Sequence, residues 1–496
     1  MTTITSPTPV RPVPDFARGP VLAMAAATAV LLTAVSGRYG YFGDELYFIA
    51  AGHQLAWGYA DQPPMLPLIA LAMDTIAPGS LPVLRIPATL ATVAGVVLTA
   101  LLAREFGGGR RAQLIAAGAF AISPNFLGTG HLLATSTLDP ALWTALTWLL
   151  VRWLRTRQDG LLIAAGVVTA VALQVKFLVV AFWVVAIVAV LVFGPRDLLR
   201  RPALWLGGAI AVLATVPTLV WQAQNGWPQL GMSRAVAAES VYAGGVIGFL
   251  PVALLMVGLL IGSVLAVHGV GRLLADPAYR FLGVTALGVT LIFLVSGGRP
   301  YYIAGMFPLL WAASAAAIER RRPAVWWRWV PTWPVYAVTA VLVLGVLHIL
   351  PIKPVSAHAD QPLQIGNFQR DEIGWPAMVD DVVAAHRALP PESARNAVVV
   401  TGDYWSLSAI QHFAPDLPAY SGARGAAWFG MPPEDSGSVI FVGDPTAVAA
   451  EFDRVTQVGA LDNDVRVANL AQGTPIFLLE GRQRPWAELW PALRHL

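Results

Sequence analysis

Residues 177–193 read FLVVAFWVVAIVAVLVF, a run of apolar residues without one charged side chain. Similar runs, separated by short charged or Pro/Gly-containing segments, recur from residue 20 to residue 350. A helix needs roughly 20 predominantly apolar residues to cross the hydrocarbon core of a bilayer. The pattern therefore predicts a polytopic α-helical membrane protein.

The composition agrees with this class. Of 496 residues, 56% are hydrophobic and 12% are charged, whereas a soluble domain has about 25% charged residues. The net charge is only +3, and the arginines sit in short clusters between apolar runs, which argues against nucleic acid as a partner. Cysteine is absent, which excludes a disulfide framework, a thiolate metal site and a cysteine nucleophile.

Hydropathy and breaker residues divide the chain into three parts. Residues 1–19 are Pro-rich and polar and predict a disordered cytoplasmic tail. Residues 20–350 predict a transmembrane domain, and residues 351–496 a separate soluble domain. Within 20–350 we expect about eleven spans, near 20–36, 83–103, 111–123, 138–154, 161–175, 177–193, 204–222, 246–268, 281–297, 301–318 and 334–350.

Basic residues fix the expected orientation. With a cytoplasmic N-terminus, fifteen arginines fall in the inner loops, and only Arg38, Lys176, Arg234 and Arg299 fall in the outer loops between spans. The positive-inside rule favours this arrangement in the cell membrane. An odd number of spans then places the C-terminal domain outside the cytoplasm.

Two outer segments interrupt the apolar pattern. Residues 37–82 contain apolar pieces too short to span, such as LPLIALAM, which predict helices lying at the membrane interface. After residue 350, short β-type and helical segments alternate and predict a small α/β domain. NAVVVTGD, GSVIFVGD and TPIFLLEG are typical of strands, and YWSLSAIQHFA and PTAVAAEFDRV of helices.

Carboxylates in the first outer loop are candidates for chemistry. Asp44 and Glu45 follow the first span, and Asp61 precedes a Pro-Pro pair one residue later. These carboxylates have two possible roles. In the structural interpretation, Asp44 and Asp61 cap interfacial helices. In the functional interpretation, a partly desolvated carboxylate at the membrane surface acts as a general base.

A third acid, Asp139, lies at the outer end of the fourth span and is followed by Pro140. It fits a helix N-cap as well as a cavity-lining acid. His131 is either a polar surface residue or a lone metal ligand. Lys176 and Arg299 lie at the outer ends of apolar spans, where cations either snorkel to the headgroups or bind a phosphate.

The order of several segments resembles a known family. GDELYF and GYADQPPMLPL resemble the first extracytoplasmic loop of the glycosyltransferase-C superfamily, in the branch that holds protein O-mannosyltransferases and the lipid A aminoarabinose transferase. LLATSTLDPALWTALTWLLVRW, ALQVKFLVV, PTLVWQAQNGWPQL and GRPYYIAGMFPLLWAA follow in the same order, so the likeness covers residues 38–320.

This resemblance implies an inverting transferase of the outer face. Such an enzyme moves a hexosyl or pentosyl group from a polyprenyl-phosphate donor to a cell-envelope acceptor, which is a lipid, glycan or protein. Carried over, Asp44 is the general base, Glu45 its supporting neighbour and Asp139 a second cavity acid.

The resemblance also implies binding residues. Asp61 matches an acid that helps hold a metal ion in the aminoarabinose branch, which makes a divalent metal the candidate cofactor. Position 62 is glutamine where that branch has a lysine near the donor phosphate. Two further groups complete the expected binding site: Lys176, Arg299, Tyr301 and Tyr302 near the donor phosphate, and Tyr404 and Trp405 near the acceptor.

Two rival interpretations belong to other functional classes. A polytopic transporter or lipid flippase places ionisable groups near mid-membrane and often has two related halves, whereas these acids gather at the outer ends of spans. A silent scaffold that binds a partner through its outer domain is the third possibility.

Overall fold

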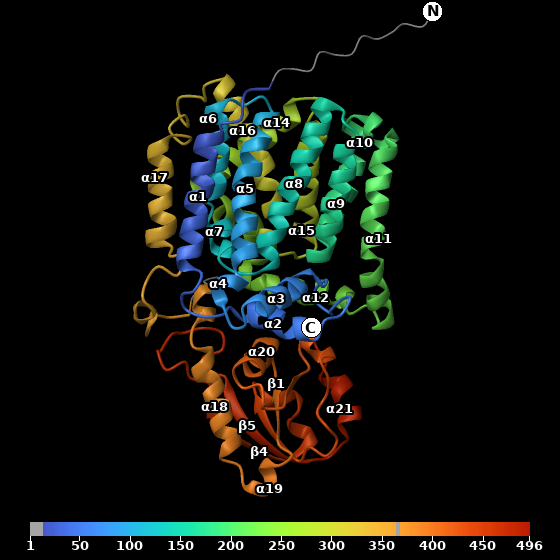
Figure 1. Cartoon of the computed structure of the whole chain (residues 1–496), viewed down its shortest axis with the longest axis vertical. Helices are drawn as coiled ribbons and strands as arrows, with labels where there is room; N and C mark the ends of the chain where they lie inside the picture. Colours follow the sequence, from blue (N-terminus) through green and yellow to red (C-terminus); the bar gives the residue numbers. More distant parts are fainter. Residues whose placement is uncertain (1–12, 364–367) are drawn as a thin grey trace, which may run out of the picture.

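The computed structural model describes residues 13–363 and 368–496 and has two parts (Figure 1). A bundle of long helices forms one part, and a smaller domain containing the sheet packs at one end of it. Most of the predicted tail, residues 1–12, lies outside the described residues. The first helix, α1, begins at Arg18.

The bundle is built from long helices and a few shorter ones, such as the seven-residue α7. Their bounds are α1 Arg18–Val35, α5 Ile86–Glu105, α6 Arg110–Ala121, α7 Pro124–Gly130, α8 Thr135–Thr156, α9 Gly160–Val175, α10 Val179–Phe193, α11 Pro202–Gln224, α13 Gly245–Ala253, α14 Leu259–Ala275, α15 Arg280–Val295, α16 Phe307–Arg320 and α17 Trp333–Val341. Each of the eleven segments expected to span coincides with one of these helices or a continuous pair.

Within residues 13–363 and 368–496, five helical segments are long and apolar enough to cross a membrane: Arg18–Val35, Leu81–Glu105, Pro202–Gln224, Gly245–Ala275 and Pro300–Arg320. Shorter apolar helices stand beside them, among them α9, α10 and α15. Side chains that face away from the bundle are apolar, for example on α10 and α11. A surface of this kind is soluble in lipid and not in water.

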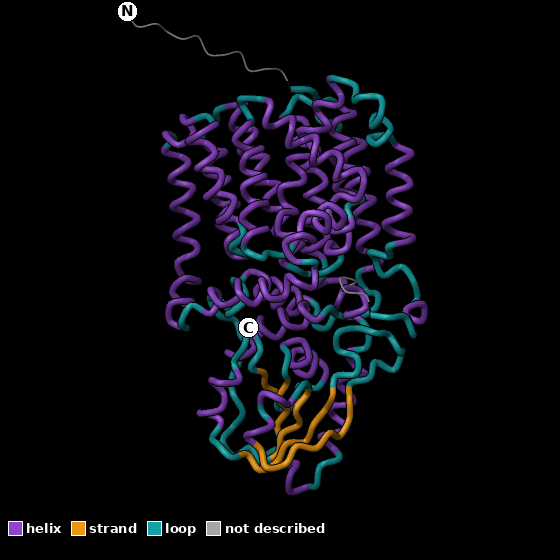
Figure 2. The backbone as a smooth tube through the Cα atoms, turned by 180° about the vertical axis from the view of Figure 1, so that it is seen from behind, coloured by secondary structure: helices purple, strands orange, loops and turns teal. Residues whose placement is uncertain are grey.

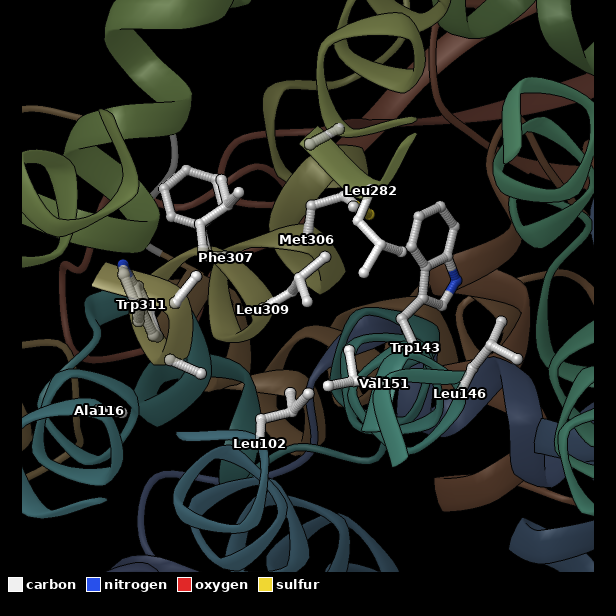
Figure 3. Packing of buried hydrophobic residues seen from close by; sticks show 14 of the residues in the cluster. Leu102, Ala116, Trp143, Leu146, Val151, Leu282, Met306, Phe307, Leu309 and Trp311 are labelled. Atoms are coloured by element: carbon white, nitrogen blue, oxygen red, sulfur yellow. The ribbon is translucent and has the colours of Figure 1, made fainter. Parts of the chain in front are cut away.

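Tight packing holds the bundle core together. Trp143, Trp311 and Met306 are buried side by side with leucines from neighbouring helices (Figure 3). Gly166 and Gly207 bring α9 and α11 into close contact, because a Cβ on Gly166 would stand 2.2 Å from the Cα of Gly207. Small residues at helix contacts replace the hydrophobic driving force that is missing in lipid.

A layer of short helices separates the bundle from the C-terminal domain (Figure 1). It contains α2 Gly43–His53, α3 Met65–Ile76, α4 Leu81–Leu84 and α12 Pro228–Glu239. α2 and α3 lie in the loop 37–82, where interfacial helices are expected, and α4 begins at the end of that loop. LPLIALAM falls within α3.

The C-terminal domain is a five-stranded mixed sheet with helices against it (Figure 2). The strand order is β2-β1-β3-β5-β4; β1 pairs in parallel with β2 and β3, and β5 is antiparallel to β3 and β4. The elements are α18 Trp375–Arg387, α19 Pro391–Ala394, β1 Val398–Thr401, α20 Tyr404–Phe413, β2 Ala419–Ser421, β3 Ser438–Val442, β4 Phe452–Ala460, β5 Pro475–Arg482 and α21 Trp486–Leu493.

Three predicted strands and one predicted helix of this domain coincide with β1, β3, β5 and α20. The helix predicted at PTAVAAEFDRV is wrong. Residues 445–447 and 449–451 form single 3-10 turns, and Phe452 begins the edge strand β4. Pairing with β5 outweighs the helical propensity of the alanines, since strand propensity depends on context.

Candidate active site

A cavity of about 320 Å³ lies where the bundle, the layer of short helices and the C-terminal domain meet. Seven of the predicted site residues line it: Asp44, Asp61, Lys176, Arg299, Tyr301, Tyr302 and Tyr404. They come from segments up to 360 residues apart in the chain. Their convergence is a property of the fold, because both parts of the molecule contribute side chains.

Asp44 projects from the first turn of α2 into this cavity. Its Oδ1 accepts a hydrogen bond from the Tyr404 hydroxyl at 2.9 Å and another from the Trp405 indole nitrogen at 2.8 Å. Among the described residues no group donates to Oδ2. The carboxylate is therefore oriented through one oxygen, which leaves the other able to accept a proton from a bound molecule.

Glu45 has a different role from its neighbour. Its side chain is fully buried, and both oxygens bind the Arg85 guanidinium, at 3.0 Å from Nε and 2.7 Å from a terminal nitrogen. It also accepts backbone N–H groups from Phe42 at the start of α2 and from Leu133. Glu45, expected to support Asp44, thus lies outside the cavity and holds α2 in place.

Arg85 extends this buried network toward the C-terminal domain. It binds the carbonyl oxygens of Ser36 and Gly40 and lies 3.3 Å from Glu372, which in turn contacts His131 at 3.0 Å. His131 is therefore a buried partner of Glu372 and not a surface residue. The network ties the first loop to the segment that enters the C-terminal domain.

Asp61 lies on the cavity wall next to the C-terminal domain. Tyr47 donates a hydrogen bond to it at 2.8 Å, and a Cβ on Gly425 would come within 2.8 Å of it. Burial raises the pKa of Asp61 to about 6, while the Tyr47 hydrogen bond and the nearby Arg424 charge oppose that rise. Asp61 is not the helix cap of the structural alternative, because Pro64 occupies the N-cap of α3.

Cations and aromatic rings occupy the bundle side of the cavity. The Lys176 amine lies 4.4 Å from the ring centre of Tyr302 and 5.4 Å from that of Tyr301. Rings hold the ammonium group by cation–π attraction without neutralising it. Lys176 ends α9 and points into the cavity instead of toward the headgroups.

Two arginines share one carboxylate at the cavity mouth. Glu239, at the end of α12, binds Arg299 from the bundle and lies 2.9 Å from Arg424 of the C-terminal domain. Arg424 also donates to the Tyr404 hydroxyl at 3.2 Å. This bridge spans α12, the bundle and the C-terminal domain, and it places a third cation on the cavity wall.

Asp139 is not a helix cap and does not line the cavity. α8 begins four residues earlier, at Thr135, and includes Pro140 in its interior. The buried Asp139 carboxylate accepts a hydrogen bond from Trp143 at 3.1 Å. It is also attracted electrostatically by the Lys176 ammonium group. Asp139, which the resemblance implies to be a cavity acid, therefore lies near Lys176 but outside the cavity lining.

The residues around Asp61 do not fit a divalent metal. A tetrahedral or octahedral site needs several oxygen or nitrogen ligands, and within 13–363 and 368–496 no three His, Asp or Glu side chains converge in such a group. Asp61 is instead hydrogen-bonded to Tyr47 and faces the Arg424 cation.

Sequence reasoning missed Arg85, Glu239 and Arg424. Arg85 carried a usable signal, since it is a lone charge at the edge of an apolar run, where an ionisable residue marks a partner or a site. Arg424 sits in SGARGAAWFG, which has no motif. Only the packing of α20 and its neighbouring turn against α2 places it near Asp44.

A family model described as dolichyl-phosphate-mannose-protein mannosyltransferase matches residues 61–221. That segment runs from Asp61 through α11 and includes Lys176. No curated protein sequence matches the chain.

Solved structures match the chain over nearly its whole length. ArnT from Cupriavidus metallidurans, bound to undecaprenyl phosphate, matches with a TM-score of 0.63 and 16% identity, over 93% of this chain and 98% of that one. The arabinofuranosyltransferase AftD from Mycobacteria matches with a TM-score of 0.52 and 15% identity, over 94% of this chain but 40% of that one. At these identities the match concerns the fold, C-terminal domain included.

Proposed function

We propose that this chain is an inverting glycosyltransferase of the outer membrane face and a member of the glycosyltransferase-C superfamily, a proposal that its fold likeness and its partial family match support. Its donor is a sugar linked to a polyprenyl phosphate, and its acceptor is a molecule of the cell envelope. One observation carries the proposal. The free oxygen of Asp44 and three cations, Lys176, Arg299 and Arg424, border the same cavity.

The chemistry of such a transfer needs two kinds of group. A base must take the proton of the acceptor hydroxyl, and positive charge must stabilise the phosphate that leaves. Asp44 Oδ2 supplies the first. As the acceptor oxygen bonds to the anomeric carbon, the bond from that carbon to the phosphate oxygen breaks, and Lys176, Arg299 and Arg424 stabilise the departing anion.

The bilayer side of the cavity suits a lipid-linked donor. Phe177, Leu178 and Ala181 at the start of α10 continue the lining from Lys176 toward the apolar bundle surface. A polyprenyl chain needs such an apolar path, while its phosphate needs the cations at the end of that path. That the ArnT structure contains undecaprenyl phosphate supports this class of donor.

The C-terminal domain supplies the other side of the site. Tyr404 and Trp405 of the C-terminal domain donate hydrogen bonds to Asp44. They lie where an acceptor would approach from the aqueous face. We assign to them the orientation of the base and contact with the acceptor. A transporter would instead need ionisable groups near the middle of the bundle, and Asp44 and Asp61 both lie at its end.

The proposal is tested with Asp44→Asn, which removes the base and little volume. Purified protein is incubated with a panel of polyprenyl-phosphate sugars and candidate envelope acceptors, and donor consumption and donor binding are measured. We expect transfer to fall by at least about 10³-fold, because proton transfer is lost and the amide cannot replace it, with donor binding retained.

Asp74→Asn is the matched control. Asp74 lies in α3 at the same end of the molecule, bonded to His53 outside the cavity, so its loss should leave transfer unchanged. Full activity of Asp44→Asn would overturn the assigned base. Failure of every donor to bind to the unmodified protein would overturn the proposed substrate class.

A further inference from the structure

A second cavity, of about 500 Å³, lies at the end of the bundle opposite the C-terminal domain. It is formed where α14 and α16 end, together with the loop that follows α16. Arg272, Arg320, Arg321, Arg322, His268 and Trp327 line it, with a few small apolar residues. The cavity shares no residue with the one that contains Asp44.

The arginines of this second cavity have no acidic partners. Within 13–363 and 368–496, no carboxylate oxygen lies within 4.0 Å of a nitrogen of Arg272, Arg320, Arg321 or Arg322. The nearest acid in the sequence, Glu319, is already bound to the backbone N–H groups of Gly109, Arg111 and Ala112 at the start of α6. Its charge therefore serves that helix N-terminus.

The Arg272 guanidinium lies on the wall of this second cavity. Among the described residues none of its nitrogens has a hydrogen-bond partner, and since Nε is buried, the terminal nitrogens are the donors that a bound anion can reach. The carbonyl ends of two helices contribute only about half a negative charge each, too little to balance four guanidinium groups.

The loop beside the cavity is suited to a membrane surface. Residues 323–329 read PAVWWRW, and Trp326 is 79% exposed while Val325 is 72% exposed. The Trp327 side chain lines the cavity, and its ring lies beside the His268 ring in a tilted arrangement. The His268 ring forms a hydrogen bond with Ser314 on α16. Exposed indoles at the end of an apolar bundle lie preferentially at the headgroup level, which brings the arginines to the depth of lipid phosphates.

We propose that this second cavity binds the phosphate of an anionic phospholipid headgroup. Arg272 and Arg321 hold the phosphate oxygens, Arg320 and Arg322 supply further charge, and the exposed indoles contact the acyl chains. A volume of 500 Å³ accommodates a headgroup, since small-molecule sites occupy about 300–1,000 Å³. Basic residues near a helix end also serve as a topology signal, but a topology signal does not need a cavity lined by four arginines without acidic partners.

The test uses the full chain in detergent, titrated with phosphatidylglycerol or phosphatidylcholine and measured by native mass spectrometry. We expect phosphatidylglycerol to bind at least about tenfold more tightly, and Arg272→Gln/Arg321→Gln to abolish that preference, because each basic residue contributes strongly to anionic lipid binding. Arg321→Gln/Arg322→Gln repeats the test with two exposed side chains whose loss cannot unfold the bundle.

Arg110→Gln/Arg111→Gln is the control, because it removes the same charge at the same end of the bundle from exposed positions outside the cavity. It should keep the lipid preference. An equal loss in this control, or an unchanged preference in both cavity variants, would overturn the proposal. So would displacement of the lipid by millimolar inorganic phosphate, which would identify a site for a free anion.

Discussion

Glu45 and Arg85 form a buried ion pair whose loss should destabilise the whole first loop. Both side chains are inaccessible to solvent. Glu45→Gln leaves the guanidinium with weaker partners, so we expect the free energy of unfolding to fall by about 3 kcal/mol, in the range measured when one member of a buried pair is removed. Thermal unfolding in detergent measures the loss.

Glu480→Gln is the matched control for this prediction. Glu480 pairs with Arg454 on the exposed edge of the sheet, where an ion pair contributes roughly 0–1 kcal/mol. An equal loss of free energy of unfolding in both variants would show that the network around Arg85 does not hold α2 in place.

Asp61 should make stability depend on pH. Burial raises its pKa to about 6 in the folded protein, from 3.8, so the folded state binds this proton more tightly than the unfolded chain. The penalty for its charge therefore appears as pH rises from about 4 to 6 and is complete above 6. Asp61→Asn should be more stable than the unmodified protein at pH 7.5 and equal to it near pH 4.

We expect Asp61→Asn to raise the free energy of unfolding by about 1 kcal/mol at pH 7.5. A pKa shift corresponds to about 1.36 kcal/mol per unit, but the cavity admits solvent, which makes the effect of this shift smaller. Unfolding midpoints of both proteins at the two pH values measure it. A constant difference across the pH range would contradict the raised pKa. Asp61→Asn should also reduce sugar transfer, since it changes the charge facing Arg424.

For individual residues, the sequence predicted which side chains belong to the site better than it predicted what each of them does. Asp44 and Glu45 are adjacent and chemically alike, yet one faces the cavity and the other a buried arginine 40 residues away. Successive positions on a helix point about 100° apart, so one of the pair had to leave the cavity. Which one depends on the docking of α2, which local sequence does not encode.

The contact between α2 and α20 decides whether the site is assembled. Trp405 lies directly on Gly43, where a Cβ would stand 2.2 Å from the indole. The indole cannot easily move, because it also packs against Phe42 and donates to Asp44. Gly43→Ala should therefore displace Trp405, lower kcat by at least about tenfold and destabilise the protein by roughly 1–3 kcal/mol, the usual cost of overpacking.

Turnover and limited proteolysis of the C-terminal domain measure these effects. Gly160→Ala is the control, because Gly160 is likewise the first residue of a helix but has no atom within 4 Å of the place that a Cβ would occupy. Normal activity in Gly43→Ala would show that α20 does not position the base.

Element types followed from periodicity in most segments of the bundle and of the sheet. The bundle helices and the strands β1, β3 and β5 agree with the expectation, whereas residues 445–455 do not. Alanine-rich sequence predicts helix, but β4 begins within it because β5 offers an unpaired edge, and that long-range partner outweighs local propensity. The position of α20 over α2 is likewise a tertiary effect.

The whole molecule has opposite charge character at its two ends, and this should set its orientation. Arginines gather in the loops at the end opposite the C-terminal domain, including the second cavity, while few stand at the other end between spans. By the positive-inside rule we expect that arginine-rich end to face the cytoplasm. The site around Asp44 and the C-terminal domain would then face the exterior, where lipid-linked sugars of the proposed kind would be used.

The chain contains no cysteine, so single-cysteine variants test this orientation without background labelling. Glu392→Cys lies exposed in the C-terminal domain, and Gln158→Cys lies exposed between α8 and α9 at the opposite end. In intact cells an impermeant maleimide should label position 392 and spare position 158, and permeabilisation should expose both. Labelling of position 158 but not 392 would put Asp44 on the cytoplasmic side and remove the basis for transfer at the outer face.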